Sequence, residues 1–362
     1  MLVAALAVVL GTPAIVTAVT APAGTVDASA LRERVARSDR QAHQGVAVIR
    51  GSLPLPVLPK LEDVSALVTG VTTVRSWYDS PERWRFDVLS TVGERDTYRT
   101  ADGEFVWDYG ADQVTQLVGT PPVRVPRAGD LLPPDLARGL LATAAGDAVS
   151  GLGARAVAGR RAEGLRLVPA DPDTTIGRVD VWVDAASGVP VLVEVTPRGA
   201  ERPVLVSAFE EFAPDRPGDD VLTPDVGRDS GFSTVEAPDL AGALGALGDD
   251  DVPASLAGRS LRQTDGAGVR GVGVYGTGLS SFVALPVPRE VGLAAADAGG
   301  KAGARDETVP NGRVVSLAVA PLSVVVVRAQ RVRRWYLLVG MVDTVVLRAA
   351  ATELIAQSGR GR

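Results

Sequence analysis

Alternation of apolar and polar residues dominates residues 78–117 and predicts a meander of short antiparallel strands. Asp102-Gly103 suits one of its tight turns, because glycine accepts a positive φ and aspartate can bond its own backbone. Successive side chains of a strand point to opposite faces, so we expect the aromatic residues on one dry face and the charged residues on the other. That face would carry Trp84, Phe86, Phe105, Trp107 and Tyr109.

Two amphipathic helices are predicted on either side of this meander. Residues 27–42 fit the first helix, whose apolar side includes Leu31 and Val35. Residues 131–145 fit the second, because two prolines and an aspartate suit its first turn. A helical layer on one face of an antiparallel sheet indicates an α+β fold. Further strands are expected at 44–53 and 64–79.

Residues 157–212 form a second block of alternating residues with turn signals between its strands. Valine recurs at every second position in 179–183 and again in 189–195, with a hairpin turn at 185–188 between the two runs. Residues 204–209 continue the sheet. Alternation alone permits either an open half-barrel or a sandwich.

The chain after residue 212 changes character. Residues 213–250 are rich in Asp, Gly and Pro and predict a linker. Beyond it we expect a short helix at 253–262, a mobile loop at 289–312, and a final helix from Asp343 to about Gln357. Strands are expected at 269–275, 279–287, 313–328 and 335–339. The predicted parts are 1–23, a signal peptide or membrane anchor; 24–212, the first domain; 213–250, the linker; and 251–362, a smaller α+β domain.

The first twenty residues carry no charge, and about 20 apolar residues are enough to span a bilayer. Ala21-Pro22-Ala23 is similar to a small-residue cleavage site, but the positive residues that usually precede the apolar run are missing. The true start therefore lies upstream, or the segment is an uncleaved anchor; a buried core helix is the alternative. We expect the rest of the chain to be extracytoplasmic.

The motifs resemble a known superfamily. The pattern P-x-R-W-R … D-G-x-x-x-W-x-Y-x-x-x-Q-V resembles the LolA/LolB-like lipoprotein carriers through Pro81, Arg83, Trp84, Arg85, Asp102, Gly103, Trp107, Tyr109, Gln113 and Val114. The second block is similar to the N-terminal domain of the RseB/MucB-like sigma-factor regulators through Val157, Ala158, Gly159, Arg160, Pro169, Trp182, Asp184, Gly188 and Pro190. A looser likeness to their smaller C-terminal domain is carried by Tyr275, Gly278, Leu279, Val339, Gly340 and Val342. The resemblance implies an antiparallel open half-barrel closed by helices.

Composition excludes several classes of function. The net charge of −6 argues against a nucleic-acid-binding protein. The absence of cysteine excludes disulfides, thiolate metal sites and a lipidated cysteine. The single histidine, His43, is interpreted as a surface or capping residue and leaves little for histidine-based catalysis. The glycines of 271–276 spell G-x-G-x-x-G inside a strand pattern, where no dinucleotide site is expected. Asp249-Asp250-Asp251 is interpreted as a solvated acidic run and not as a metal site. We therefore predict no cofactor, no metal and no catalytic residues.

Two groups of residues are candidates for binding. The first is a concave aromatic wall for an acyl chain or apolar peptide, with ordinary core packing as the alternative; it consists of Trp77, Trp84, Phe86, Trp107, Tyr109 and Trp182. The second is a basic cluster that could contact acidic lipid headgroups or an acidic partner, with a charged, edge-protecting hairpin tip as the alternative. It consists of Arg328, Arg331, Arg333 and Arg334.

The leading functional hypothesis is a non-enzymatic binding protein of the cell envelope. The resemblance implies that it holds a lipid or lipoprotein acyl chain and contacts a membrane-bound anti-sigma factor, and that it thereby regulates a sigma-factor stress response. A carrier without a signalling role is the second hypothesis. An envelope hydrolase that uses His43 is the third.

Overall fold

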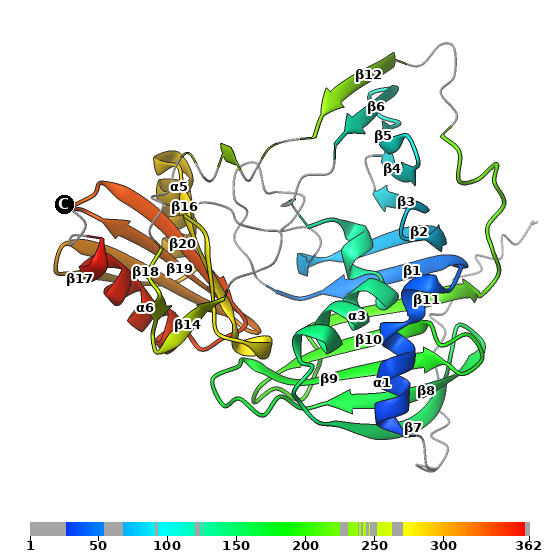
Figure 1. The fold of residues 1–362 in the computed structure, drawn as a ribbon, viewed down its shortest axis with the longest axis horizontal. Coiled ribbons are helices and arrows are strands. Elements are labelled where there is room, and N and C mark those ends of the chain that lie inside the picture. The colour runs from blue at the N-terminus through cyan, green and yellow to red at the C-terminus, as the bar shows by residue number, and fades with distance from the viewer. Residues whose placement is uncertain are drawn as a thin grey trace, which may run out of the picture.

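The computed structural model describes residues 27–53, 68–90, 93–119, 124, 126–224, 231–237, 239, 242–243, 246, 252–262 and 271–358. The predicted N-terminal export segment and the Asp249–Asp251 run lie outside these residues. Figure 1 shows two sheets side by side, each with its own helices. Within the described part of the chain, no helix combines the length and apolar content that a bilayer span requires.

The larger sheet has twelve strands in the order β12-β6-β5-β4-β3-β2-β1-β11-β10-β9-β8-β7. It is open, because β12 and β7 form opposite edges. All of its pairs are antiparallel except β12 with β6. Its strands are β1 (His43–Gly51), β2 (Val71–Ser80), β3 (Arg83–Ser90), β4 (Gly93–Thr100), β5 (Gly103–Asp108), β6 (Gln113–Val118), β7 (Val149–Val157), β8 (Arg160–Leu167), β9 (Ile176–Asp184), β10 (Pro190–Pro197), β11 (Leu205–Ala213) and β12 (Gly231–Glu236).

Helices α1 (Ala28–Ala36) and α3 (Pro133–Thr143) cover one face of this sheet over β7–β11 (Figure 1). We call this side the helix face and the opposite side the outer face. Leu31 and Val35 pack with the inward valines of β9 and β10, and this core fills the covered half of the half-barrel. The α+β, open half-barrel prediction is therefore confirmed. Helix α1 ends six residues earlier than predicted, and a short 3₁₀ turn, η1 (Ser38–Arg40), leads into β1.

The smaller sheet has eight strands in the order β13-β14-β15-β16-β20-β19-β18-β17. Helices α5 (Arg289–Lys301) and α6 (Thr344–Gln357) pack on its opposite faces, because Val315 and Val326 lie with α5 whereas Val314, Val325 and Val327 lie with α6. Its strands are β13 (Ser255–Leu256), β14 (Arg259–Arg262), β15 (Gly273–Tyr275), β16 (Phe282–Val287), β17 (Arg305–Val309), β18 (Gly312–Val319), β19 (Leu322–Ala329) and β20 (Arg334–Gly340).

Several predictions for this second half of the chain are wrong. The expected helix at 253–262 is the hairpin β13–β14, because Ala257 and Gly258 both take a positive φ and turn the chain back. The expected mobile loop at 289–312 contains α5 and β17; its glycines and alanines are the packing face of a helix. The expected strand at 313–328 is two strands, β18 and β19, paired as a hairpin.

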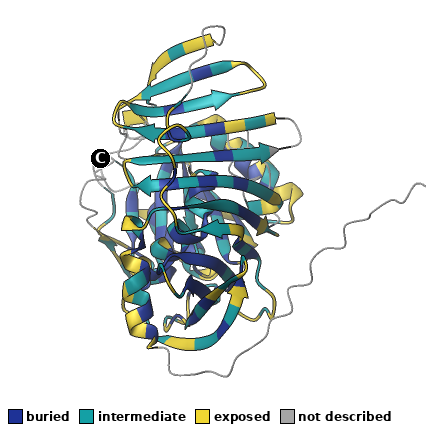
Figure 2. Cartoon of the chain, turned by 90° about the vertical axis from the view of Figure 1, so that its right-hand side faces the viewer, coloured by how far each residue is buried: buried dark blue, intermediate teal, exposed yellow. Residues whose placement is uncertain are grey.

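The segment that follows β11 crosses the outer face before it reaches β12. Arg216 pairs with Asp79 of β2 at 2.8 Å, and Arg83 of β3 pairs with Asp219 at 2.8 Å. Figure 2 shows this coil running across the strands. Strand β12 lies inside the segment that we predicted as a linker, and the domain boundaries proposed from composition stay a prediction.

Candidate functional site

The predicted aromatic wall is divided between the two faces of the sheet. Strand pairing places Phe86 opposite Thr97 and Tyr98 opposite Phe105, so the aromatic residues of β3 and β5 have opposite orientations. The prediction of one common aromatic face is therefore wrong. The physical reason is the register: each hairpin turn fixes which residues are opposite, and β4 between them shifts the aromatic positions of β5 to the other face.

Trp84 and Phe86 lie on the helix face. Their rings stack with centroids 4.5 Å apart, and both side chains are half-buried. Phe86 contacts Gly129 of the 3₁₀ turn η2 (Ala128–Leu131), where even a methyl group would meet the ring at 2.6 Å. The guanidinium of Arg127 lies over Trp84 at 5.7 Å. This pair is the part of the predicted wall that faces the inside of the half-barrel.

The remaining aromatic candidates lie on the outer face. Trp107 stacks on Tyr109 at 4.5 Å and packs against a small buried cluster of Tyr98, Phe105 and Val114. Trp77 lies beneath the Arg85 guanidinium at 4.9 Å. These side chains pack among themselves and against charged groups, away from the helix-covered core.

Trp182 is also on the outer face. Side chains alternate along β9, so Trp182 points to the face opposite that of Val181 and Val183, although all three belong to one continuous buried cluster. The Arg155 guanidinium covers its ring at 4.5 Å, and Arg155 pairs with Glu194 at 3.5 Å. The structure therefore does not bring Trp182 together with Trp84.

A buried charged cluster lies between Trp77 and Trp107. Arg85 donates to both carboxylate oxygens of Asp87, at 2.6 and 2.9 Å, and to Asp96 at 2.8 Å. Asp87 and Asp96 are fully buried. Burial, followed by repulsion from Asp87, raises the pKa of Asp96 to about 7. One oxygen of Asp96, Oδ1, has no hydrogen-bond partner, so the neutral acid fits this site better than the carboxylate.

The carboxyl groups of the same cluster are close enough together to bind a metal cation, but arginine side chains already compensate their charge. Carboxylate oxygens of Asp87, Glu94 and Asp96 lie within 4.8 Å of one another. Arg85 holds two of these groups, and Arg75 pairs with Glu94 and with Asp87. Two guanidinium groups balance two of the three acids, and the third, Asp96, holds its proton up to about pH 7 because its pKa is raised, so the cluster is a buried ion-pair network.

His43 is neither a surface nor a capping residue, which corrects the interpretation made from sequence. Only 2% of it is exposed, its ring stacks on Tyr78 at 5.0 Å, and Phe209 and Phe212 lie at 6.0 Å. Burial lowers the pKa of His43 to about 4, so the ring is neutral at physiological pH. Nδ1 lies 2.9 Å from the Gln41 carbonyl oxygen. An enclosed, neutral ring of this kind cannot reach a substrate.

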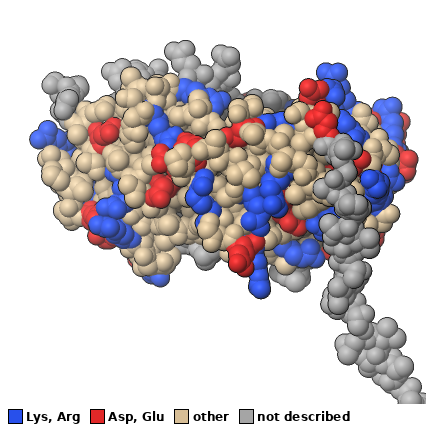
Figure 3. All heavy atoms as spheres, turned by 90° about the horizontal axis from the view of Figure 1, so that it is seen from below, with Lys and Arg blue, Asp and Glu red and all other residues tan. Residues whose placement is uncertain are grey.

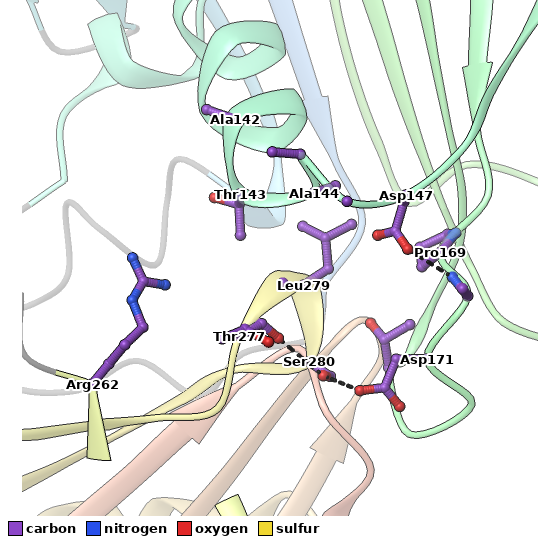
Figure 4. A pocket seen from close by; sticks show the side chains of 15 residues that line it. Ala142, Thr143, Ala144, Asp147, Pro169, Asp171, Arg262, Thr277, Leu279 and Ser280 are labelled. Atoms are coloured by element: carbon purple, nitrogen blue, oxygen red, sulfur yellow. Dashed lines mark hydrogen bonds between the residues drawn. The ribbon is translucent and has the colours of Figure 1, made fainter. Parts of the chain in front are cut away.

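A pocket of about 760 Å³ lies between the two sheets, and no pattern along the chain predicts it. It is bounded by the end of α3, the loop before β9, Arg262 of β14, and the 3₁₀ turn η3 (Gly278–Ser280). Figure 4 shows Arg262 on one side and the Asp147 and Asp171 carboxylates on the other. Hydroxyls of Thr143, Thr174, Thr277 and Ser280 complete the polar lining.

The two halves of this pocket are fixed to each other. The N–H of Thr175 donates to Met341 at 3.1 Å, and the N–H of Asp343 donates to Asp173 at 2.8 Å. Arg259 pairs with Asp173 at 2.8 Å and with Asp171 at 3.5 Å.

Hydrogen bonds across the junction also set the protonation of Asp171. Burial would raise the pKa of this carboxyl, but donors led by Ser280, together with the Arg259 charge, hold it below its usual range. The Asp171 carboxylate is therefore ionised and already bonded within the protein. Arg262 is the cationic side chain in the pocket lining and can pair with an acidic group of a partner.

The predicted basic cluster lies at the end of the smaller sheet that is remote from this pocket. Arg328 is the second-to-last residue of β19, Arg331 and Arg333 are in the turn, and Arg334 begins β20. Arg328, Arg331 and Arg333 are exposed, and Arg334 is half-buried. Arg328 lies over the buried Trp335 at 5.8 Å. The structure therefore brings these four residues together as one hairpin tip.

No family model matches the chain, and no curated protein matches it. Among solved structures, a MucA/MucB complex from Pseudomonas aeruginosa is 19% identical, and the match covers 90% of this chain and 97% of the other with a TM-score of 0.51. A structure of MucB in complex with MucA(peri) is 17% identical, with the same coverage and a TM-score of 0.50. At these identities the likeness shows the fold alone, and it confirms the expected RseB/MucB-like architecture over both domains.

Proposed function

We propose that this chain is an extracytoplasmic, non-enzymatic binding protein that engages a membrane-bound anti-sigma factor through the pocket between its two sheets. The observation that carries the proposal is the pocket itself: a cleft of about 760 Å³ between two sheets locked together by backbone hydrogen bonds. Solved MucB structures of the same fold contain MucA as a partner, which supports a partner protein here.

The chemistry of the cleft suits an extended polar segment. Its lining contains hydroxyl groups and charges of both signs, whereas the carbonyl groups at the end of α3 already accept from Arg32. Such a lining offers donors and acceptors to a peptide backbone and an ion-pairing partner at Arg262. A preformed cleft also requires little reorganisation on binding.

The test is a blocking substitution in the cleft. Ala142 is exposed on α3 and lines the pocket, so Ala142→Trp should obstruct part of it without disturbing the core. Ala356 is exposed on α6 outside the cleft, and Ala356→Trp is the matched control. Calorimetric titration with extracytoplasmic segments of the cell's own anti-sigma factors should show at least a roughly tenfold loss for Ala142→Trp alone. Equal affinity of both variants for these segments would show that the cleft is not the binding site.

A bound lipid or lipoprotein acyl chain is the second part of the proposal, and the stacked Trp84–Phe86 pair on the helix face favours it. An acyl chain gains about 0.8 kcal/mol for each CH₂ that it buries, so a short apolar wall is enough to hold one. Organic extraction of the purified protein followed by mass spectrometry should recover lipid. Recovery of lipid from a protein that binds no anti-sigma factor would favour the carrier hypothesis. The hydrolase hypothesis requires His43 to reach a substrate, and the enclosure of His43 argues against it.

A further inference from the structure

The tip of the β19–β20 hairpin presents three exposed arginines, Arg328, Arg331 and Arg333. The chain turns at Gln330–Arg333, where Arg333 takes φ 54° and its N–H donates to Gln330 at 3.2 Å. The N–H of Gln330 donates to Asn311 at 2.9 Å and ties the turn to the neighbouring hairpin. The tip is thus a braced feature of the sheet end.

Some exposed arginines in other parts of this chain have an acidic partner and others, such as Arg161 and Arg202, have none within the part of the chain that the structure describes; the tip differs in that its unpaired arginines are neighbours. Arg37 pairs with Glu33, Arg50 with Glu210 and Arg216 with Asp79. Among the described residues, Arg328, Arg331 and Arg333 have no carboxylate within ion-pair distance. Arg328 is also directly opposite another cation in the sheet, Arg313, whose charge is taken by Asp306 at 2.5 Å.

We propose that this arginine tip, residues 328–334, binds an anionic bilayer surface. The whole chain carries a net charge of −6, so attraction to an anionic surface has to come from a local cluster. A protein partner would need a buried aromatic or aliphatic anchor. Trp335, the nearest aromatic ring, is only 6% exposed, and none of the exposed large hydrophobic residues lies in the tip. Headgroups require charge alone.

The tip lies where it can contact a bilayer while the cleft between the sheets binds a partner segment. Strand β20 runs from the tip at Arg334 to Gly340, next to the interdomain bonds at Met341. Seven residues of strand span about 20 Å, which would hold the cleft clear of the headgroups. Figure 3 shows acidic and basic side chains interspersed over the face seen from below. Among its described residues, this face therefore has no large patch of positive charge that would compete with the tip for an anionic surface.

The test is co-sedimentation of the full chain with vesicles of phosphatidylcholine containing phosphatidylglycerol. Binding should fall as salt rises. The triple variant R328Q/R331Q/R333Q should bind on the order of 100-fold more weakly, because each basic residue near an anionic surface contributes about fivefold. R37Q/R50Q/R216Q removes the same charge elsewhere and should bind as the unmodified protein does. Melting temperatures of both variants exclude loss of folding.

The outcomes are distinct. Equal binding by the two triple variants, or equal binding to neutral phosphatidylcholine vesicles, would overturn the proposal. Binding to an acidic polypeptide such as polyglutamate, without binding to vesicles, would assign the tip to a protein partner and would also overturn it. The proposal does not depend on the cleft, so Ala142→Trp should leave vesicle binding unchanged.

Discussion

At the scale of single residues, burial decides which carboxyl groups have a raised pKa. Asp96 and Asp87 are both fully buried and lie side by side; Arg85 bonds to both, but Arg75 pairs with Asp87 and not with Asp96, so Asp96 has only a shared guanidinium. Neither carboxylate could be identified as special from the sequence, where each is an ordinary polar residue of an alternating strand. Their role follows from register, which places Asp87 directly opposite Asp96.

Asp96→Asn should change the pH dependence of stability. The carboxyl titrates near 3.9 in the unfolded chain and near 7 in the fold, so between these values the folded state holds the extra proton. Stability from this group is therefore present below about pH 4 and lost as the pH rises through 7. The amide keeps a hydrogen-bond acceptor for Arg85 and cannot ionise.

Thermal melts from pH 5 to 8 check this expectation. At pH 8 the variant should melt about 2–4 °C above the unmodified protein, the shift that ~1 kcal/mol produces in a domain of this size. At pH 5 the two proteins should differ little. Melting curves that run parallel across the whole range would show that Asp96 does not titrate in it.

At the scale of elements, local pattern predicted strands well and their faces badly. The strand predicted at 44–53, which is β1, and the terminal helix capped by Asp343 agree with the sequence prediction. The common aromatic face failed, because it depends on the length of two turns. Ser90 pairs with Gly93 and Thr100 with Gly103, so counting across these turns would have separated Phe86 from Trp107.

The division of the aromatic residues gives opposite expectations for two tryptophans. Trp84→Ala removes a half-buried ring from the helix face and should weaken binding of a fluorescent acyl probe while lowering the melting temperature little. Trp107→Ala removes a partly buried ring that packs on the buried Tyr98, Phe105 and Val114, so it should lower the melting temperature by a few degrees without affecting probe binding. Probe titration and thermal melts separate these effects. Equal loss of probe binding in both variants, after correction for unfolding, would contradict the assignment of faces.

Helix α5 was missed because its packing face is made of small residues. Periodic large apolar residues are the usual helix signal, whereas α5 buries Gly292, Ala295, Ala296 and Gly299. Such residues let the helix approach the sheet closely, and Trp335 fills the space above Gly292. Strand β7 also escaped prediction, since Gly151 and Gly153 interrupt its alternation.

Two glycine substitutions in α5 should have opposite effects. A methyl group at Gly292 would lie 2.6 Å from the Trp335 ring, so Gly292→Ala should destabilise the smaller domain by about 1–3 kcal/mol through overpacking. Gly300 has open space around its Cβ position, and Gly300→Ala should stabilise by about 0.5–1 kcal/mol because alanine favours the helix. Urea unfolding measures both. Stabilisation by Gly292→Ala would mean that the helix is not seated against Trp335.

At the scale of the whole molecule, the decisive contacts join segments far apart in the chain. The loop before β9 bonds to residues 341–343, and β12 pairs with β6 after crossing the outer face. Local alternation carries no information about such contacts, so the cleft between the sheets could not be predicted from it. The resemblance in sequence suggested two domains but not how they are joined.

Arg259→Ala should uncouple the unfolding of the two domains. The guanidinium is 13% exposed and bonds to Asp171, Asp173 and Ser280, so its removal leaves two acids without their cation. We expect calorimetry to show the smaller domain melting first in a separate transition. Arg313→Ala, which breaks the exposed pair with Asp306 in the same domain, is the control and should cost at most about 1 kcal/mol with no change in cooperativity. If Arg259→Ala gave one transition at the unmodified temperature, the backbone bonds at 341–343 alone would hold the domains together, and the cleft would keep its shape without this residue.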